Sequence, residues 1–265
     1  MINPEKIKRV VIKVGTSTLT YDNRKPHFQH IERLVRNISD IKNSGRDVIL
    51  VSSGAIAIGV SKLDMAEKPQ GTPAKQAVAA VGQLTLMYTY DKFFAEYGQK
   101  VAQVLLTRDV FENEQRNQNA VNALNHILAL SAIPIINEND TVAIEEIEFG
   151  DNDRLSASVA VMCEADLLII LSDIDGLYDG NPKASSDVKL IPVVKEVDDN
   201  LYEIASGTGS NRGTGGMVTK LDAVKVAAAA GIETFIANGS TPDILLDIIN
   251  GTAKGTLFEC EKDNL

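Results

Sequence analysis

Two lysines, a set of carboxylates and a glycine-rich loop are the residues of this chain whose types and spacing could do chemistry. Lys13 lies in the apolar run VVIKVG and is followed by the hydroxyl residues of GTSTLT, and Lys220 closes the stretch GTGSNRGTGGMVTK. Lysines beside bare glycine backbone are typical of phosphate sites. Carboxylates recur in NENDTV, FGDNDR and SDIDGLYDGNP. This set predicts phosphoryl transfer, which depends on positioning and charge neutralisation more than on covalent help from the protein.

Each of these residues also has a purely structural explanation. Lys13 could protect an edge strand from aggregation, and Asp153 could cap the helix predicted after it. Asp140 is a common type of turn residue, and residues 206–213 could form a plain surface loop. Lys220 is harder to explain in this way, because a lysine at the start of a helix opposes the helix dipole. A bound anion explains Lys220 better than helix stability does.

Several other kinds of site are excluded by their missing motifs. The glycine-rich stretch has neither the Gly-Lys-Ser/Thr of a Walker loop nor the glycine spacing of a dinucleotide fingerprint, which argues against an NAD-binding protein. DND and SDIDG lack the glycine and distal glutamate of a calcium loop. No Gly-x-Ser-x-Gly occurs and no histidine stands near a nucleophile motif, so a serine hydrolase is not expected. Without a histidine base, the acceptor is expected to be an anion already, such as a carboxylate.

The elements that must position these residues alternate between apolar strands and helical patterns. This alternation predicts an α/β fold, a three-layer αβα sandwich around a mostly parallel central sheet. Ligands bind beyond the carboxyl ends of the strands in such sheets, and polar segments follow most of the strands here, so a cleft is expected at that edge. We expect strands at 7–16, 46–55, 100–107, 132–137, 166–172 and 232–237, with helices at 28–45, 74–98, 118–131, 154–165 and after the glycine-rich stretch.

Composition limits the class of protein and its partners. The 265 residues, 28.6 kDa and 44% hydrophobic content suffice for a substantial core, and we expect one catalytic domain over 1–265. A net charge of -10 argues against a nucleic acid or an anionic membrane as the main partner. The first residues are polar and no apolar stretch approaches a membrane span, so a cytoplasmic protein is expected. Two cysteines and three scattered histidines predict neither a disulfide framework nor a zinc site.

An ordered set of motifs resembles the glutamate 5-kinases of the amino acid kinase family. The resemblance runs from about Lys8 to Phe258 and rests on KVGTSTLT, VSSGAIAIG, AAVGQ, LLTRD, INENDTV, FGDND, DIDGLYDGNP and GTGGMVTKLDAV. FGDND and GTGGM with the downstream lysine are its most specific parts. It implies that ATP, with Mg²⁺, phosphorylates the side-chain carboxylate of L-glutamate to give L-glutamyl 5-phosphate and ADP. This is the first step of proline biosynthesis, and the product would pass to glutamyl phosphate reductase.

The resemblance also implies roles for individual residues. Lys13 and Lys220 would neutralise charge on the transferring phosphoryl group, and Asp153 would hold both lysines in place. The glutamate would be bound by Ser53, Asp140 and Asn152, with Asp151 close by. The ATP site would comprise Lys13, Gly15, Ser172, Asp173, Thr214, Gly215, Gly216, Met217 and Lys220. No metal site in the protein itself is implied, because Mg²⁺ would be bound mainly through the ATP phosphates.

Departures from the family and rival functions define what has to be tested. The family commonly has threonine where Ser172 stands, and many members carry a C-terminal PUA domain that we do not expect here, since the sequence ends at Leu265. Members are often homo-oligomers and often inhibited by proline. One rival is an amino acid kinase acting on acetylglutamate, aspartate, carbamate or UMP. Another is a non-catalytic amino acid or nucleotide sensor on the same fold, which would not need both lysines.

Overall fold

An eight-stranded sheet forms the centre of the molecule. The computed structural model describes residues 2–143, 152–182, 187–206 and 216–260. The strand order is β3-β4-β2-β1-β5-β7-β8-β6, and every pair is parallel except β7 with β8. The strands are β1 (Arg9–Val14), β2 (Asp47–Ser52), β3 (Lys100–Leu106), β4 (Ala132–Glu138), β5 (Leu167–Ser172), β6 (Val193–Val194), β7 (Glu233–Asn238) and β8 (Thr256–Phe258).

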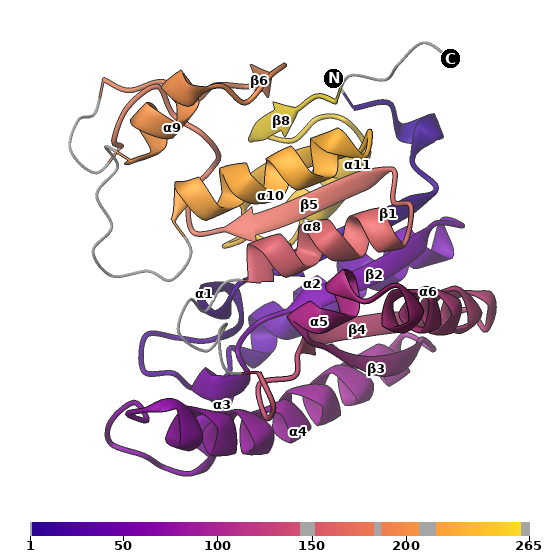
Figure 1. The fold of residues 1–265 in the computed structure, drawn as a ribbon, viewed down its shortest axis with the longest axis vertical. Helices are drawn as coiled ribbons and strands as arrows, with labels where there is room; N and C mark the ends of the chain where they lie inside the picture. Colours follow the sequence, from indigo (N-terminus) through magenta and orange to yellow (C-terminus); the bar gives the residue numbers. More distant parts are fainter. Residues whose placement is uncertain (1, 144–151, 183–186, 207–215, 261–265) are drawn as a thin grey trace.

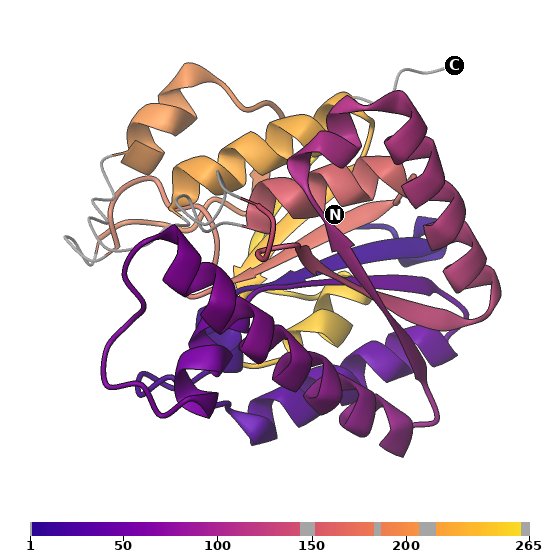
Figure 2. The ribbon, with the colours of Figure 1, turned by 60° about the horizontal axis from the view of Figure 1, so that its bottom comes forward.

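Helices cover both faces of this sheet, so the predicted three-layer sandwich is confirmed (Figures 1 and 2). Apolar side chains of α2 (Phe28–Asn43), α3 (Ala55–Lys62), α4 (Thr72–Glu96) and α11 (Ile244–Ile249) form one core layer with the sheet. Those of α6 (Glu114–Ala129), α8 (Asn152–Met162), α9 (Asp199–Ser206) and α10 (Met217–Ala229) form the other. The short elements are η1 (Pro4–Lys6), α1 (Thr16–Leu19) and α5 (Arg108–Glu112).

The sequence signals for the first β-α-β unit explain how it forms. The apolar side chains of α2 recur every three or four residues, at Ile31, Leu34, Val35, Ile38 and Ile41, and all are buried against the sheet. The helix is followed by Gly45, whose φ of 92° is the left-handed conformation that commonly ends a helix.

Strand β1 occupies the middle of the sheet, between β2 and β5. Its residues from Val10 to Val14 are all buried, including Lys13 at 5% exposure. Lys13 shares a face of the strand with Val11, which belongs to the core layer under α8 and α10. The edge-strand explanation of this lysine is therefore wrong, because β1 has a hydrogen-bonded neighbour on each side.

Two glycines bring α3 and α4 into backbone contact. A Cβ atom added to Gly82 would lie 1.8 Å from the carbonyl oxygen of Ala55, and one added to Gly59 would lie 2.1 Å from that of Val78. No side chain fits at either place. The motifs VSSGAIAIG and AAVGQ, which supply these glycines, therefore fix how closely α4 approaches α3, and with it the position of α4 beside the sheet.

The segments that the prediction missed are short. β6 and β8 have two and three residues, and β8 is the antiparallel member of the sheet. Such lengths carry no usable alternation of apolar and polar residues. The expected helix at 154–165 begins two residues earlier, at Asn152, which places Asp153 inside its first turn. Among the described residues, no helix combines the length and apolar character needed to cross a membrane.

Candidate active site

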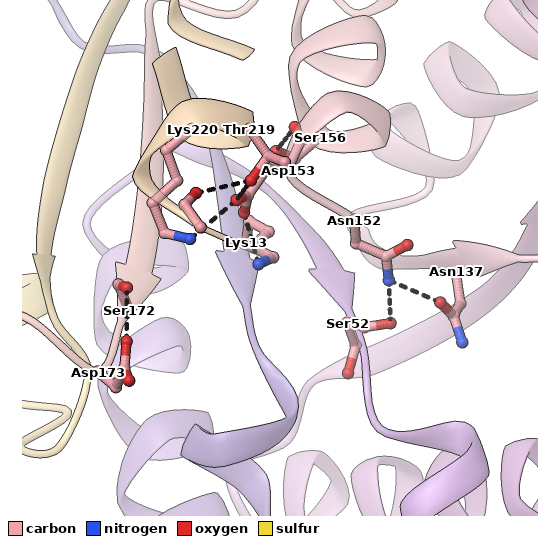
Figure 3. A network of polar contacts seen from close by, with 11 residues as sticks. Lys13, Ser52, Asn137, Asn152, Asp153, Ser156, Ser172, Asp173, Thr219 and Lys220 are labelled. Carbon is pink, nitrogen blue, oxygen red and sulfur yellow. Dashed lines mark hydrogen bonds and ion pairs between the residues drawn. The ribbon is translucent and has the colours of Figure 1, made fainter. Parts of the chain in front are cut away.

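Three buried charged side chains meet at the carboxyl end of the central strands (Figure 3). Lys13 Nζ lies 2.5 Å from Asp153 Oδ1, and Lys220 Nζ lies 3.0 Å from Asp153 Oδ2. The exposed fractions of Lys13, Asp153 and Lys220 are 5%, 0% and 4%. Buried charges are costly unless they are paired, and here one carboxylate pairs with two ammonium groups. Within the trio, one formal positive charge remains.

The three charges come from three elements. Lys13 is the next-to-last residue of β1, Asp153 the second of α8 and Lys220 the fourth of α10. The two helices pack on the same face of the sheet, which directs both side chains toward Lys13. A carboxylate in the first turn of α8 is also favoured by the dipole of that helix. The alternative explanation, that Asp153 caps the helix from a position before its first turn, is therefore wrong.

Hydroxyl groups complete the surroundings of Asp153. Thr219 Oγ1 lies 2.8 Å from the carbonyl oxygen of Gly216 and 3.3 Å from Asp153 Oδ2, and it can donate its single proton to either acceptor. Ser156 Oγ donates to the backbone carbonyl of Asp153 at 2.6 Å. Thr219 lies within the stretch Thr214–Lys220 that is predicted to contact ATP, but the prediction gives it no role of its own. Its only signal is the hydroxyl in GTGGMVTK, which cannot be told from a helix-surface threonine by sequence alone.

The start of α10 lies beside the same cluster. Gly216 precedes the helix with extended backbone, at φ −71° and ψ 176°, and no side chain caps the first turn. Met217 begins the helix and is buried. Uncapped N–H groups at a helix start are suited to an anion. Gly15 lies near Lys13 as well, because a Cβ atom added there would be 3.8 Å from Lys13 Nζ. Thr214 and Gly215, also predicted for this site, lie outside the described residues.

A second polar group surrounds Asn152, next to Asp153 in sequence. Asn152 Nδ2 donates to the backbone carbonyl of Ser52 at 3.1 Å and to Asn137 Oδ1 at 2.8 Å (Figure 3). Asn137 is buried, and its own nitrogen donates to Gln83 Oε1 at 2.9 Å. Asn152 is a predicted site residue, whereas Asn137 and Gln83 are not.

Two other residues predicted to bind glutamate, Ser53 and Asp140, lie at the same edge of the sheet. Ser53 directly follows β2, and its backbone nitrogen donates to the carbonyl of Val14 at the end of β1. Asp140 lies in the turn after β4, which runs parallel to β2. Asp151 lies outside the described residues. The structure thus brings Ser53, Asn152 and the charged trio to adjacent strand ends.

The predicted nucleotide residues after β5 form a separate small group. Ser172 Oγ lies 3.2 Å from Asp173 Oδ1, and the Ser172 side chain is nearly buried while Asp173 is exposed. Two residues on, Asp175 accepts hydrogen bonds from Lys254, Asn238 and Tyr178. The bond from Lys254, followed by that from Asn238, holds the pKa of Asp175 below its usual value. These bonds tie the loop after β5 to β7 and to the segment before β8.

The donor set of this site suits a phosphate more than a metal ion. Both oxygens of Asp153 contact lysine ammonium groups, so this carboxylate is not arranged as a metal ligand. Among the residues that the structure describes, no group of three or more histidine, cysteine, aspartate or glutamate side chains could hold a metal.

Comparison with known proteins settles the family. The model of the amino acid kinase family matches residues 8–238. The chain belongs to the amino acid kinase family. A glutamate 5-kinase of Clostridium perfringens (strain 13 / Type A) is 55% identical over 259 residues, which are 96% of each chain. A glutamate 5-kinase of Caldanaerobacter subterraneus subsp. tengcongensis is 52% identical over 250 residues, which are 94% of this chain and 67% of that relative.

Solved structures share the fold at much lower identity. A UMP kinase from Ureaplasma parvum aligns with a TM-score of 0.67 and 16% identity, covering 96% of this chain and 99% of that one. An isopentenyl phosphate kinase from T. acidophilum aligns with a TM-score of 0.65 and 17% identity, covering 95% and 100%. This chain thus shares its fold, a central sheet between two helical layers, with these two kinases.

Proposed function

We propose that the chain transfers the γ-phosphoryl group of ATP to the side-chain carboxylate of L-glutamate, which gives L-glutamyl 5-phosphate and ADP. The observation that carries this proposal is the buried trio of Lys13, Asp153 and Lys220, which concentrates positive charge where α10 starts. The near-full-length likeness to glutamate 5-kinases selects glutamate as the acceptor. The reaction would be the first step of proline biosynthesis.

The trio would act on the phosphoryl group during its transfer. One carboxylate oxygen of glutamate forms a bond to the γ-phosphorus while the bond to the β-phosphate bridging oxygen breaks, and ADP leaves with that electron pair. The acceptor is already an anion at neutral pH, so no general base is needed. Lys13 and Lys220 would stabilise the charge on the phosphoryl oxygens, and a buried site makes that stabilisation stronger than in water. Asp153 would be a positioning residue for both lysines.

The two substrates would approach from opposite sides of the trio. ATP would bind along Gly15, Ser172, Asp173 and the stretch Thr214–Lys220, with Gly216 and Met217 presenting backbone N–H groups to phosphate. Mg²⁺ would accompany the nucleotide and neutralise part of its charge. Glutamate would bind near Ser53, Asp140, Asp151 and Asn152, the side on which Asn152 and the end of β2 lie (Figure 3).

A coupled assay tests the proposal and its main rivals together. The chain is incubated with ATP, Mg²⁺ and L-glutamate in the presence of hydroxylamine, which traps an acyl phosphate as the hydroxamate. We expect ADP and hydroxamate to form in equal amounts and to depend on glutamate. Formation of ADP with acetylglutamate, aspartate, carbamate or UMP, but not with glutamate, would move the substrate assignment to that acceptor. No ADP with any of them would favour a non-catalytic sensor.

The wider setting of the reaction belongs to the same proposal. The chain would act as one catalytic domain over 1–265 in the cytoplasm, its labile product would be consumed by glutamyl phosphate reductase, and proline would inhibit it. A proline titration of the assay checks the last point, and unchanged activity would remove it.

Association with a second copy of the chain is also part of the proposal. Leu84 and Tyr88, one turn apart on α4, are 75% and 68% exposed, which is unusual for large apolar side chains. Two copies of α4 could bury these faces against each other. We expect light scattering to give at least twice the mass of one chain, and Leu84→Glu to reduce that mass; a monomer in the unchanged chain would contradict the association.

A further inference from the structure

A chain of side-chain amides connects the proposed glutamate site with helix α4. Asn152 donates to Asn137, and Asn137 donates to Gln83, at 2.8 and 2.9 Å. The three residues come from α8, β4 and α4, so the chain of bonds crosses from one helical layer, through the sheet, to the other. Gln83 is the last residue of the AAVGQ motif, to which neither the sequence analysis nor the proposed function gives a role.

The backbone carbonyl of Ser52 determines the direction of each bond in this chain. A carbonyl oxygen can only accept, so the end of the Asn152 amide that faces it must be the nitrogen. That nitrogen also meets Asn137, which must therefore present its oxygen, and the nitrogen of Asn137 is then left to donate to Gln83. The oxygen of Gln83 is the acceptor that this order requires.

This order leaves one polar atom of Asn152 to a substrate. Its nitrogen is bonded to Ser52 and Asn137, whereas none of the described residues donates to its Oδ1. In Figure 3 that oxygen points away from both partners. An acceptor in this position suits the α-ammonium group of an amino acid. If the Asn152 amide turned over, it would present a donor to that group instead.

The position of Gln83 is set by backbone contacts of its neighbour Gly82, and its buried amide nitrogen lowers the stability of the fold. The neighbouring Gly82 touches Ala55 and Gly59 of α3, so the position of α4 at this turn is set by main-chain atoms. The nitrogen of Gln83 is buried and has no hydrogen-bond partner among the described residues. A buried, unpaired amide nitrogen destabilises the folded state. An apolar residue would avoid that cost, so stability alone does not account for a glutamine here.

We propose that Gln83 is a positioning residue for the amino acid substrate. Its oxygen holds Asn137, Asn137 holds Asn152, and Asn152 thereby keeps its oxygen toward the substrate. The inference rests on the proposed function, because it takes glutamate as the molecule that Asn152 contacts. It extends that function by one residue on the opposite side of the sheet from the lysines.

Steady-state kinetics of Gln83→Met test this role. Methionine has a similar length but neither acceptor oxygen nor amide nitrogen, so Asn137 loses its partner and the order of the amides is no longer enforced. We expect the KM for glutamate to rise about fivefold to tenfold, the equivalent of one lost hydrogen bond, with the KM for ATP and kcat changed by less than about twofold. The urea midpoint should stay within the error of the unchanged chain, since the buried nitrogen is removed with the bond.

Two further variants separate positioning from general damage. Gln83→Glu keeps an oxygen that can accept from Asn137, and it should restore most of the glutamate KM. Gln99→Met removes a bond of the same kind, from Gln99 Nε2 to Asn43 Oδ1 at 2.8 Å, beyond the far end of α4. This control should leave both KM values unchanged.

The outcomes distinguish this inference from the proposed function. Equal rises in both KM values, or a lowered urea midpoint with lost kcat, would show that Gln83 only supports the fold. Unchanged kinetics in Gln83→Met would overturn the inference as well. In either case the unchanged chain would still phosphorylate glutamate. If the unchanged chain forms no glutamate-dependent ADP, the proposed function fails first; titration of the nucleotide-free chain with L-glutamate by calorimetry then still decides whether Gln83→Met weakens binding.

Discussion

Asp153 is the residue on which the arrangement of both lysines depends. Its side chain is fully buried and contacts Lys13 on one oxygen and Lys220 and Thr219 on the other. One buried carboxylate thus lies between two buried ammonium groups, and in the proposed reaction a phosphate would bring further negative charge to them.

Replacing Asp153 by asparagine should destabilise the fold. The substitution keeps the shape of the side chain but leaves two buried ammonium groups without its charge. We expect the free energy of unfolding to fall by about 3 kcal/mol, as when one partner of a buried ion pair is removed. Urea unfolding measures it. Asp173→Asn, which changes an exposed carboxylate at the same sheet edge, is the matched control. An unchanged urea midpoint would show that the charge of Asp153 does not stabilise the fold.

Replacing Lys220 by alanine should lower turnover far more than glutamate affinity. The ammonium group would stabilise charge that develops on the phosphoryl group, so its loss should reduce kcat by about a hundredfold or more, while the KM for glutamate changes by less than about threefold. Lys225→Ala on the same helix, where the lysine lies 4.8 Å from the centre of the Tyr202 ring, should leave both values nearly unchanged. Losses of equal size in kcat and in glutamate affinity would contradict the assigned role.

The sequence predicts the residues of this site better than their contacts. Lys13 and Lys220 could be named because lysines in a buried strand and at a helix start are unusual, whereas the role of Asp153 came from the resemblance to a known family. Thr219, Asn137 and Gln83 could not, because hydroxyl and amide residues are common at helix surfaces and strand ends. Only the three-dimensional structure shows that Asn137 and Gln83 bond to one another across the sheet.

At the scale of secondary-structure elements, the contact between α3 and α4 is the least tolerant of change. Gly82→Ala would place a methyl group 1.8 Å from the carbonyl oxygen of Ala55, and backbone cannot move away as a side chain can. We expect the free energy of unfolding to fall by at least about 2 kcal/mol, as in overpacked cores. Ala80→Ser, an exposed position on the same helix, is the control. A fold as stable as the unchanged chain would mean that α4 can shift without loss.

The stability of the fold should depend on pH through Asp175, which lies in the loop after β5. The hydrogen bond from Lys254 holds the pKa of Asp175 in the folded state below its ordinary value. The folded state therefore binds this proton less readily than the unfolded state, and the stabilisation is present above the unfolded pKa and lost as the pH falls through the folded pKa. Asp175→Asn should be less stable than the unchanged chain near neutral pH. The difference should shrink below about pH 4, which urea midpoints across pH would show. If the two urea midpoints differ by the same amount at every pH, Asp175→Asn destabilises the fold through packing and not through the loss of charge.

Element types are predictable here where the patterns are long, and unpredictable where they are short. The strands from β1 to β5 and β7 read as apolar runs because helices cover both faces of the sheet. β8 and β6 are too short for such a pattern, and their place at the sheet edge depends on contacts made by the segments around them. The sequence pattern places the start of α8 two residues too far along the chain, because Asn152 and Asp153 are poor helix formers. In the structure, their side chains bond to groups outside the helix.

At the scale of the whole molecule, the parallel strand order places every chemically active segment at one edge. The carboxyl ends of β1, β2, β4 and β5 point the same way, so residues far apart in sequence meet beyond them. The same property made the site edge predictable from alternation alone. What alternation does not give is the order of the strands across the sheet, and that order puts Lys13 in the middle.

The trio also joins the first strand of the chain to its last long helix. During synthesis the buried position of Lys13 in β1 is made long before α8 supplies its carboxylate and α10 supplies the second lysine. Long-range contacts of this kind form late in folding, because most of the chain must be ordered first. A chain that stops before α10 therefore lacks Lys220, so the cluster of two lysines around Asp153 forms only after nearly all of the chain has been made.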